Sequence, residues 1–338
     1  MMQLELRAPA AGRVEVVEGP CCDPAHGEVR VAVQRCGICG SDLHWFLGRQ
    51  MLPPVCPGHE MSGIVDAVGA GVSGVREGDR VTVEPLVRCG ECTLCRRGDY
   101  HLCARLQIPG LTAPGGMASS LVVPAYSLFT LPDSIDFELG ALAEPTAVTV
   151  HALRLANVGS GSGVLILGAG TIGLLTAAAA RHLGAEHVSI TARHEHQREA
   201  ALRLGCDEVL TPDSACDVSG HPGAVIETVG GTASTLDDAV SVVARGGSVI
   251  VVGLFEQPPA FNPLTFIMKE VRIVGSMVYN RKAGRADFDI ALEILTDHRS
   301  QLRPLVTHVV PLKDAQVAFE TAADKKSGAV KVMLDPTA

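Results

Sequence analysis

Four cysteines lie close together in the first third of the chain, at a spacing that suits a metal ion. Residues 89–95 read Cys-Gly-Glu-Cys-Thr-Leu-Cys, and a further cysteine stands at position 103. Four thiolates fill the tetrahedral coordination of Zn²⁺ and leave no position for a substrate, so this metal should be structural. Gly90 and Gly98 allow the tight turns that wrap one ion. We therefore expect a structural zinc bound by the four cysteines, Cys89, Cys92, Cys95 and Cys103.

Disulfides or unrelated thiols are the alternative interpretation of this run. Disulfides are typical of secreted chains, but residues 1–9 lack the charged and then apolar pattern of a signal peptide. Eleven cysteines is an odd number, which fits a reducing compartment with some thiols on metal. No uninterrupted apolar stretch reaches the ~18 residues of a membrane span. The sequence thus predicts a cytoplasmic protein.

The composition limits the classes of partner. A chain of 338 residues with 47% hydrophobic and 19% charged residues can bury a core and suggests about two domains. A net charge of −9 argues against nucleic acid or an anionic membrane as the main partner. Aromatic residues make up only 4%, so few side chains are available to stack on bases. We expect a small-molecule substrate.

The first part of the chain, residues 1–150, is predicted to be an irregular β domain with long loops. Helical patterning is sparse there, and short β-branched runs are bounded by Gly, Pro and Asp. We expect strands at 29–33, 63–68 and 80–83. The last part of the chain, residues 285–338, carries one long helix and two short strands (306–310 and 329–333) and is expected to complete this domain.

Residues 151–284 show a different pattern, in which strands alternate with helices. The wholly apolar run 163–167 is typical of a strand covered on both faces. Such alternation predicts an α/β fold with a doubly wound parallel sheet. The expected strands are 163–168, 187–191, 208–210, 224–227, 248–252 and 271–274, and the expected helices are 171–183, 195–204, 232–244 and 263–269.

A glycine-rich loop joins the first of these strands to its helix. It reads Gly168-Ala-Gly-Thr-Ile-Gly, the fingerprint of a dinucleotide-binding βαβ unit when it stands in this context. The first glycine makes the tight turn, the second lets the backbone approach the pyrophosphate, and the third allows close helix–strand packing. A plain tight turn is the alternative. The expected cofactor-binding residues of the loop are Gly168, Gly170, Thr171, Ile172 and Gly173.

The end of the second strand of this unit bears on the choice between NAD(H) and NADP(H). Sites that prefer NAD(H) usually have an acid there, but this chain has Ala192 followed by Arg193 and His194. A guanidinium offers a charged fork to a 2′-phosphate, whereas an acid would repel it. We therefore expect NADP(H) to be preferred and NAD(H) to be possible. The alternative is that Arg193 is a solvated surface residue.

Three further motifs flank the cysteine cluster: Cys36-Gly-Ile-Cys-Gly-Ser-Asp-Leu-His, Pro57-Gly-His-Glu and Ala143-Glu-Pro. Together with the phosphate loop, their order resembles the zinc-dependent medium-chain dehydrogenase/reductase superfamily, and within it the alcohol, polyol and butanediol dehydrogenase branch. The resemblance spans nearly the whole chain. It implies a GroES-like catalytic domain, a Rossmann nucleotide-binding domain, and two zinc ions per chain, one of them catalytic.

The resemblance also implies a set of ligands for the catalytic zinc. Cys39 and His59 would bind it. Glu60 would be either a ligand or a carboxylate that moves on and off the metal during ligand exchange. Glu144 stands where alcohol dehydrogenases have a second cysteine and polyol dehydrogenases a glutamate, and it would bind zinc directly or through water. Asp42 would orient His59.

By the same resemblance, Ser41 takes the proton of the substrate and His44 passes it to solvent. Zinc lowers the pKa of an alcohol, so the proton can leave near neutral pH. The hydride then passes to the nicotinamide, which the protein positions. In the reverse direction the same site reduces a ketone.

The substrate is less sharply indicated. Trp45 stands at a position that often lines the substrate pocket in this family, although core packing is the other interpretation. Sorbitol-type enzymes tend to place an arginine before a tyrosine, and here Val278 precedes Tyr279. A site with fewer polar partners suits a substrate with fewer hydroxyl groups. We expect a secondary alcohol or ketone, with a polyol or sugar as the alternative.

Two further expectations concern function and assembly. A nicotinamide-binding protein without catalysis is the alternative outside the enzymes, disfavoured by intact Cys39, His59 and Glu60. The resemblance implies a homodimer or homotetramer, in which nucleotide domains pair edge to edge. We place this edge near the apolar run 248–255, because an exposed apolar strand would otherwise invite aggregation.

Overall fold

A computed structural model describes residues 2–338 and divides the chain into two compact units. The first unit contains residues up to Glu144 and the segment Leu295–Ala338, and the second contains Pro145–Ile294. These boundaries lie inside two helices, α4 (Ala143–Leu155) and α9 (Asp287–Asp297). The sequence analysis placed the two domain boundaries near residues 150 and 285. The first lies after the structural boundary and the second before it.

The first unit is built on a seven-stranded sheet. Six of its strands follow the order β16-β17-β3-β4-β5-β7, and β6 pairs with β3. All of these neighbours are antiparallel except β16 and β17. The strands are β3 (Glu28–Gly37), β4 (Glu60–Val68), β5 (Arg80–Val83), β6 (Ser120–Pro124), β7 (Leu128–Thr130), β16 (Val306–Pro311) and β17 (Lys331–Asp335).

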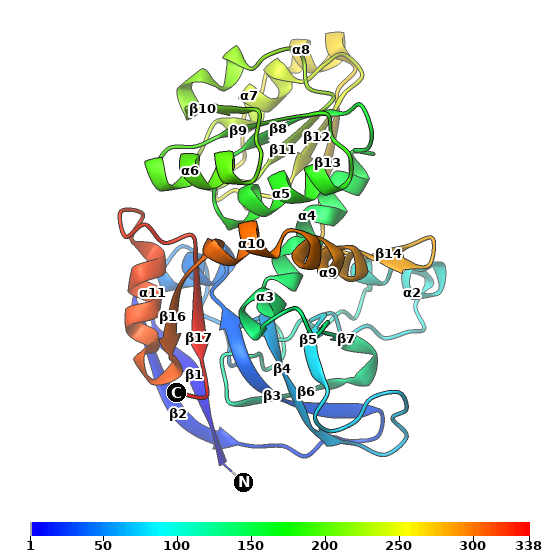
Figure 1. The fold of residues 1–338 in the computed structure, drawn as a ribbon, viewed down its shortest axis with the longest axis vertical. Coiled ribbons are helices and arrows are strands. Elements are labelled where there is room, and N and C mark those ends of the chain that lie inside the picture. The colour runs from blue at the N-terminus through cyan, green and yellow to red at the C-terminus, as the bar shows by residue number, and fades with distance from the viewer. Residues whose placement is uncertain (1) are drawn as a thin grey trace. The chain divides into compact units, whose positions relative to one another are not determined.

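A separate hairpin and several short helices complete the first unit (Figure 1). The hairpin consists of β1 (Met2–Ala10) and β2 (Arg13–Pro20). Its helices are α1 (Gly40–Phe46), α2 (Thr93–Arg97), α3 (Phe137–Ala141), α10 (Arg299–Leu302) and α11 (Ala315–Ala323). Helix α11 packs on α1 through Phe319, whose ring lies 5.2 Å from that of Trp45 and 5.1 Å from that of Phe46. The sequence predicted one long C-terminal helix, but the chain forms the three helices α9, α10 and α11.

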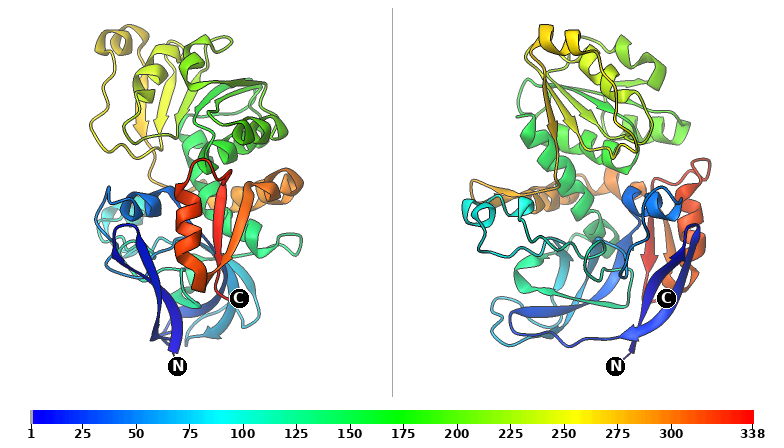
Figure 2. Two further views of the ribbon diagram at one scale, coloured as in Figure 1. Left: turned by 90° about the vertical axis from the view of Figure 1, so that its left-hand side faces the viewer. Right: turned by 180° about the vertical axis from the view of Figure 1, so that it is seen from behind.

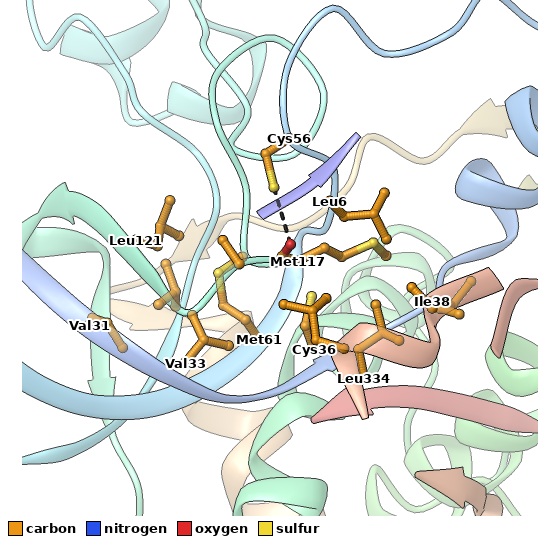
Figure 3. Close-up of a cluster of buried hydrophobic side chains, with 14 of the residues drawn as sticks. Leu6, Val31, Val33, Cys36, Ile38, Cys56, Met61, Met117, Leu121 and Leu334 are labelled. Atoms are coloured by element: carbon orange, nitrogen blue, oxygen red, sulfur yellow. Dashed lines mark hydrogen bonds between the residues drawn. The ribbon is translucent and has the colours of Figure 1, made fainter. Parts of the chain in front are cut away.

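The core of the first unit lies where strands β3, β4 and β17 meet the segment around Met117 (Figure 3). Cys36 and Cys56 belong to it. The thiol of Cys56 donates a hydrogen bond to the carbonyl oxygen of Met117 at 3.3 Å. Burial raises the pKa of Cys56 to about 12, so this thiol stays protonated and unreactive.

The second unit is the predicted doubly wound domain. Its six strands are parallel and lie in the order β10-β9-β8-β11-β12-β13. Helices lie against both faces of the sheet (Figures 1 and 2). The strands are β8 (Gly163–Leu167), β9 (His187–Thr191), β10 (Glu208–Leu210), β11 (Ala224–Glu227), β12 (Ser248–Val251) and β13 (Arg272–Gly275). The helices between them are α5 (Thr171–His182), α6 (Glu195–Arg203), α7 (Thr235–Val242) and α8 (Pro263–Lys269).

Two features of this unit were not predicted. A small hairpin, β14 (Arg281–Lys282) and β15 (Arg285–Ala286), precedes α9. The carboxylate of Asp287 fixes this hairpin, because it accepts hydrogen bonds from His151 Nδ1 at 2.9 Å and from the backbone N–H of Asn280 at 2.7 Å. The second feature is helix α4 itself, for whose residues the sequence analysis named no element.

The strand that we expected at the exposed edge of the sheet lies in its interior. Strand β12 contains most of the apolar run that we placed at the edge, but it pairs with β11 on one side and β13 on the other. The edge strands among the described residues are β10 and β13. An apolar run is equally typical of an interior strand, and composition alone does not separate the two positions.

In the part of the chain that the structure describes, no helix combines the length and the apolarity needed to cross a membrane.

The glycines of the phosphate loop give a stability prediction. A Cβ atom on Gly173 would overlap the carbonyl oxygen of Gly168, whereas one on Gly170 would meet nothing within 4 Å. We expect Gly173→Ala to lower the free energy of unfolding by about 1–3 kcal/mol through overpacking. Gly170→Ala should change it by less than about 0.5 kcal/mol. Urea denaturation of both variants measures this, and equal losses would contradict the packing argument.

Candidate active site and cofactor loop

Strand ends bring the predicted catalytic ligands together in the first unit. Cys39 lies two residues beyond the end of β3, and His59 immediately precedes β4. The two strands are antiparallel, with Gly37 opposite Glu60. One ligand atom from each of Cys39, His59 and Glu60 lies within 4.8 Å of the others. The structure therefore assembles three of the four predicted ligands in one place.

A buried lysine from β17 holds Glu60. Lys331 Nζ lies 2.6 Å from Glu60 Oε2 and 2.9 Å from Oε1, and it also donates to the carbonyl oxygen of Ile38 at 3.0 Å. The two side chains are only 3% and 1% exposed. Gly37 is required beside them, because any Cβ there would overlap Glu60 Oε2. The ammonium group of Lys331 thus holds the Glu60 carboxylate beside Cys39 and His59.

The charges around His59 are mostly negative. Burial by itself lowers the pKa of His59, but the nearby groups Cys39, Asp42 and Glu144 outweigh it and raise this pKa well above its usual value. Burial likewise raises the pKa of Asp42, which is fully enclosed. For Lys331, the opposing effect of burial is outweighed by Glu60 and Cys39, so its pKa also lies above the usual value. A buried anionic group of this kind calls for a cation.

Glu144 lies near this group but outside it. Its side chain is 5% exposed, and its charge acts on both His59 and Lys331. It is not one of the residues whose ligand atoms lie within 4.8 Å of one another. Direct binding of metal by Glu144, as opposed to binding through water, therefore stays a prediction.

Helix α1 carries the predicted proton-transfer residues next to Cys39. The carboxylate of Asp42 accepts a hydrogen bond from the backbone N–H of Cys39 at 2.9 Å, which fixes the start of the helix. The buried atoms Ser41 Oγ and His59 Nδ1 have no hydrogen-bond partner among the described residues. Buried polar atoms are rarely left unpaired. Contact of Ser41 Oγ with a bound ligand stays a prediction. His44 follows on the same helix.

The donor set fits zinc. A thiolate, an imidazole and a carboxylate are all zinc ligands, and three protein ligands leave a position open for a substrate. Cys39, His59 and one carboxylate supply such a set. The charges of Asp42 and His59 act on each other, and the orientation of His59 by Asp42 stays a prediction.

The second group of ligands is the predicted cysteine cluster. The sulfur of Cys89 lies 3.4 Å from that of Cys103 and 3.8 Å from that of Cys95, and Cys92 lies 3.9 Å from Cys103. Tetrahedral zinc with bonds of about 2.3 Å requires sulfurs roughly 3.8 Å apart. The four sulfurs thus have the spacing of a closed zinc site.

Backbone N–H groups stabilise thiolates in this cluster. The N–H groups of Glu91 and Cys92 point to the sulfur of Cys89 and lower its pKa to about 6. Burial raises the pKa of Cys95 to about 12, so Cys89 loses its proton more readily than Cys95. Helix α2 starts at this point, with Cys92 as its N-cap, and Gly98 ends it in a left-handed conformation at φ 91°. The glycine at 98 therefore performs the turn that the sequence predicted.

The phosphate loop of the second unit lies between β8 and α5. Gly168 has φ 99°, a left-handed conformation that favours glycine. Two threonines from neighbouring strands anchor it: Thr191 Oγ1 accepts from the N–H of Gly168 at 2.9 Å, and Thr228 Oγ1 donates to the carbonyl oxygen of Leu167 at 2.8 Å. The backbone of Gly170 borders open space, as an approach by the pyrophosphate requires, and Gly173 lies against the carbonyl oxygen of Gly168, as close helix–strand packing requires. Thr171 and Ile172 begin α5.

The residues expected at a 2′-phosphate follow directly after Thr191. Ala192 is buried, and its N–H bonds to the carbonyl oxygen of Leu210 at 2.9 Å. Arg193 is exposed. The rings of His194 and His196 stack with centroids 5.5 Å apart at the start of α6. Because Thr191 bonds the N–H of Gly168, the turn that follows it lies beside the phosphate loop. Contact of Arg193 with a 2′-phosphate stays a prediction.

The two predicted pocket residues are buried in aromatic clusters. Trp45 is 3% exposed, and its ring meets those of Phe46 and Phe319. Tyr279 is 1% exposed and meets Phe288 edge to face at 5.0 Å. For Trp45 the structure favours core packing, which the sequence left open. Contact of either ring with substrate stays a prediction.

The sequence analysis missed Lys331. Its only signal was a lysine within an otherwise apolar strand, Ala329-Val-Lys-Val-Met. A charged residue in such a run is rarely buried without a partner of opposite charge. That observation would have predicted a buried ion pair but not which acid forms it.

Comparison with known proteins agrees with this architecture. Residues 25–133 match the alcohol dehydrogenase GroES-like domain, and residues 171–297 match the zinc-binding dehydrogenase family. The first segment contains the predicted catalytic ligands Cys39, His59 and Glu60 and the cysteine cluster, and the second begins within the phosphate loop, at Thr171.

Individual relatives cover nearly the whole chain. The 2-dehydro-3-deoxy-L-galactonate 5-dehydrogenase of Pseudoalteromonas atlantica is 37% identical over 90% of each chain. The L-idonate 5-dehydrogenase of Vitis vinifera is 34% identical over 91% of this chain and 88% of its own. A zinc-binding dehydrogenase of Sinorhizobium meliloti, solved bound to NADP, matches with a TM-score of 0.90 at 29% identity over 99% of this chain and 100% of its own. The chain therefore belongs to the zinc-dependent medium-chain dehydrogenase/reductase superfamily, whose members are oxidoreductases acting on CH–OH groups.

Proposed function

We propose that this protein is a zinc-dependent alcohol dehydrogenase and carbonyl reductase that transfers hydride between NADP(H) and a secondary alcohol or ketone. The observation that carries the proposal is the group formed by Cys39, His59 and Glu60 beside the unpartnered hydroxyl of Ser41. A non-catalytic nicotinamide-binding protein would have no need of these ligands or of this hydroxyl.

Different residues of the first unit bind the metal, transfer the proton and position these groups. Zinc held by Cys39, His59 and a carboxylate would act as a Lewis acid that lowers the pKa of the substrate hydroxyl. Ser41 accepts the proton of that hydroxyl, and His44, further along α1, passes it towards solvent. Asp42 keeps α1 in place through the N–H of Cys39. Lys331 compensates the charge of Glu60 when this carboxylate is off the metal.

The phosphate loop and Arg193 support NADP(H) as the preferred cofactor. The N–H groups at the start of α5 meet the pyrophosphate. The exposed guanidinium of Arg193 provides the charge that a 2′-phosphate requires, and no acid occupies the adjoining position, which is the buried Ala192. NAD(H) remains the second possible cofactor.

A second candidate substrate is a polyol or a sugar-derived acid. The relatives from Pseudoalteromonas atlantica and Vitis vinifera are both named for sugar acids and for dehydrogenation at position 5. Position 5 of such an acid is a secondary alcohol, so both candidates share one reaction. Val278, in place of an arginine, is what favours the substrate with fewer hydroxyl groups.

We expect two zinc ions per chain. Cys39→Ser should remove the catalytic ion and abolish turnover, while the melting temperature changes little, because the Lys331–Glu60 pair is intact. Cys95→Ser should remove the other ion and lower the melting temperature, since a structural zinc contributes folding energy. Metal analysis, initial rates and thermal unfolding measure these effects. Full activity of Cys39→Ser would refute the assignment.

Cofactor and substrate can be tested in one panel of secondary alcohols, diols, polyols and sugar acids, each with NADP⁺ and NAD⁺. We expect higher kcat/KM with NADP⁺. Arg193→Ala should lower kcat/KM for NADP⁺ by about ten- to a hundredfold, as expected for a lost hydrogen bond to a charged group, and leave the value for NAD⁺ within threefold. An equal loss with both cofactors would show that Arg193 does not meet the 2′-phosphate.

We also propose that the protein forms homodimers, or tetramers built from them, through the edge of the second unit. Strand β13 has only β12 as a neighbour among the described residues, and α8 exposes Leu264, Ile267 and Met268 at 67%, 67% and 61%. Exposed apolar groups of this kind mark interaction sites, and an identical edge strand can pair with β13 about a two-fold axis.

Sedimentation velocity tests this interface. Ile267→Glu should shift the protein towards monomers, because it places a charge at the centre of the apolar face. Leu202→Glu is the matched control: Leu202 is 59% exposed on α6, and its replacement should leave the assembly unchanged. A wild-type monomer, or equal dissociation of both variants, would count against the interface.

We infer a cytoplasmic location, with which the eleven free thiols are consistent.

A further inference from the structure

A buried glutamate of the second unit takes no part in the proposed chemistry. Glu227 is the last residue of β11, the strand next to β8, and it is fully enclosed. No cation lies within ion-pairing distance of its carboxylate in the described part of the chain. Unpaired buried carboxylates are costly, so this position requires an explanation.

The carboxylate is satisfied by neutral donors gathered on one oxygen. Oε1 accepts hydrogen bonds from the backbone N–H groups of Val229 and Gly230, each at 2.9 Å, and from Thr235 Oγ1 at 2.8 Å. Thr235 is the first residue of α7, and the N-cap, Ser234, makes no side-chain cap. The positive end of the α7 dipole thus faces the charge of Glu227 and stabilises it. Oε2 is buried without a partner.

The turn that Glu227 holds lies against the phosphate loop. A Cβ on Gly168 would stand 2.7 Å from Val229 Cγ2, which shows how closely the two turns approach. Thr228, next to Glu227, donates to Leu167 and lies 3.2 Å from the carbonyl oxygen of Gly168. Any movement of the turn 228–231 therefore moves the anchor of Gly168.

Glu227 also joins this turn to the one after β12. Its own carbonyl oxygen accepts from the N–H groups of Val252 and Gly253, at 2.9 and 3.0 Å. A side chain on Gly253 would overlap Oε2. Both turns stand at the carboxyl ends of parallel strands, which is the edge where open α/β sheets bind ligands.

We infer that Glu227 is a positioning residue for the nicotinamide cofactor: its buried carboxylate holds the turn 228–231 and the turn after β12 in the conformation that the phosphate loop needs. It acts without touching the cofactor. The inference rests on the proposed function only in taking the phosphate loop as the NADP(H) site, and it assigns the second unit a determinant of cofactor affinity outside the glycine-rich loop.

The test is fluorescence titration of the full-length, zinc-loaded protein with NADPH. Glu227→Gln keeps one acceptor oxygen but removes the charge, so we expect the Kd for NADPH to rise about tenfold, the usual margin of a charge-assisted hydrogen bond over a neutral one. Glu227→Ala removes the acceptor as well and should raise the Kd further. Zinc content, and kcat at saturating cofactor, should stay within twofold of wild type for Glu227→Gln.

Glu208→Gln is the matched control. Glu208 begins β10 at the opposite edge of the same sheet and bonds Ser189 and Ser219, so its loss should cost stability and leave the Kd within twofold. Should Glu227→Ala fail to fold, Thr235→Val still tests the inference, because it removes one donor to Oε1 and should raise the Kd about threefold.

An unchanged Kd in Glu227→Gln, with or without a lower melting temperature, would overturn the inference and show that Glu227 serves stability alone. The proposed function fails in a different way. Wild-type protein that binds NADPH but turns over no alcohol or ketone would refute the proposed reaction, while the effect of Glu227→Gln on the Kd would still support the positioning role.

Discussion

The catalytic group of the first unit depends on one buried ion pair. Lys331 and Glu60 come from strands at opposite ends of the sequence and are almost entirely enclosed. Desolvating two charges is costly, and removing either partner typically costs about 3–5 kcal/mol because the other remains uncompensated. The pair therefore keeps the start of β17 against Ile38 and, with it, the end of β3, from which Cys39 projects. The position of Cys39 therefore depends on Lys331, which bonds the preceding residue.

The second unit buries a carboxylate without any cation. Glu227 relies on two backbone N–H groups, one hydroxyl and a helix N-terminus. Partial charges of this kind are fixed by the fold and do not move when a ligand binds, which suits a residue that must hold two turns still. An ammonium on a flexible stem, such as that of Lys331, instead suits the exchange between a metal and a protein partner that is predicted for Glu60. The two units thus stabilise buried acids by different means that match what each acid has to do.

The sequence predicted those sites whose residues lie close together along the chain. The cysteine cluster and the phosphate loop are contiguous runs whose chemistry follows from their residue types, and the family resemblance added Cys39, His59 and Glu60. It did not predict what distant pairing determines. Lys331 stands 271 positions from Glu60, and β12 is interior because β13 pairs beyond it. Each of these depends on which strands become neighbours, and hydrophobic pattern carries little information about that choice.

One local signal for such distant contacts was nevertheless present in the glycines. A Cβ on Gly37 would overlap Glu60, one on Gly253 would overlap Glu227, and one on Gly19 would come within 2.8 Å of both carboxylate oxygens of Glu5. All three glutamates are buried. A glycine within or near the end of a strand often marks a close approach by another group, and at these three positions that group is a carboxylate, whereas at Gly63 it is the backbone of Ala32. The glycine leaves the space that an enclosed carboxylate needs, so these three positions resist substitution for the same physical reason as the acids themselves.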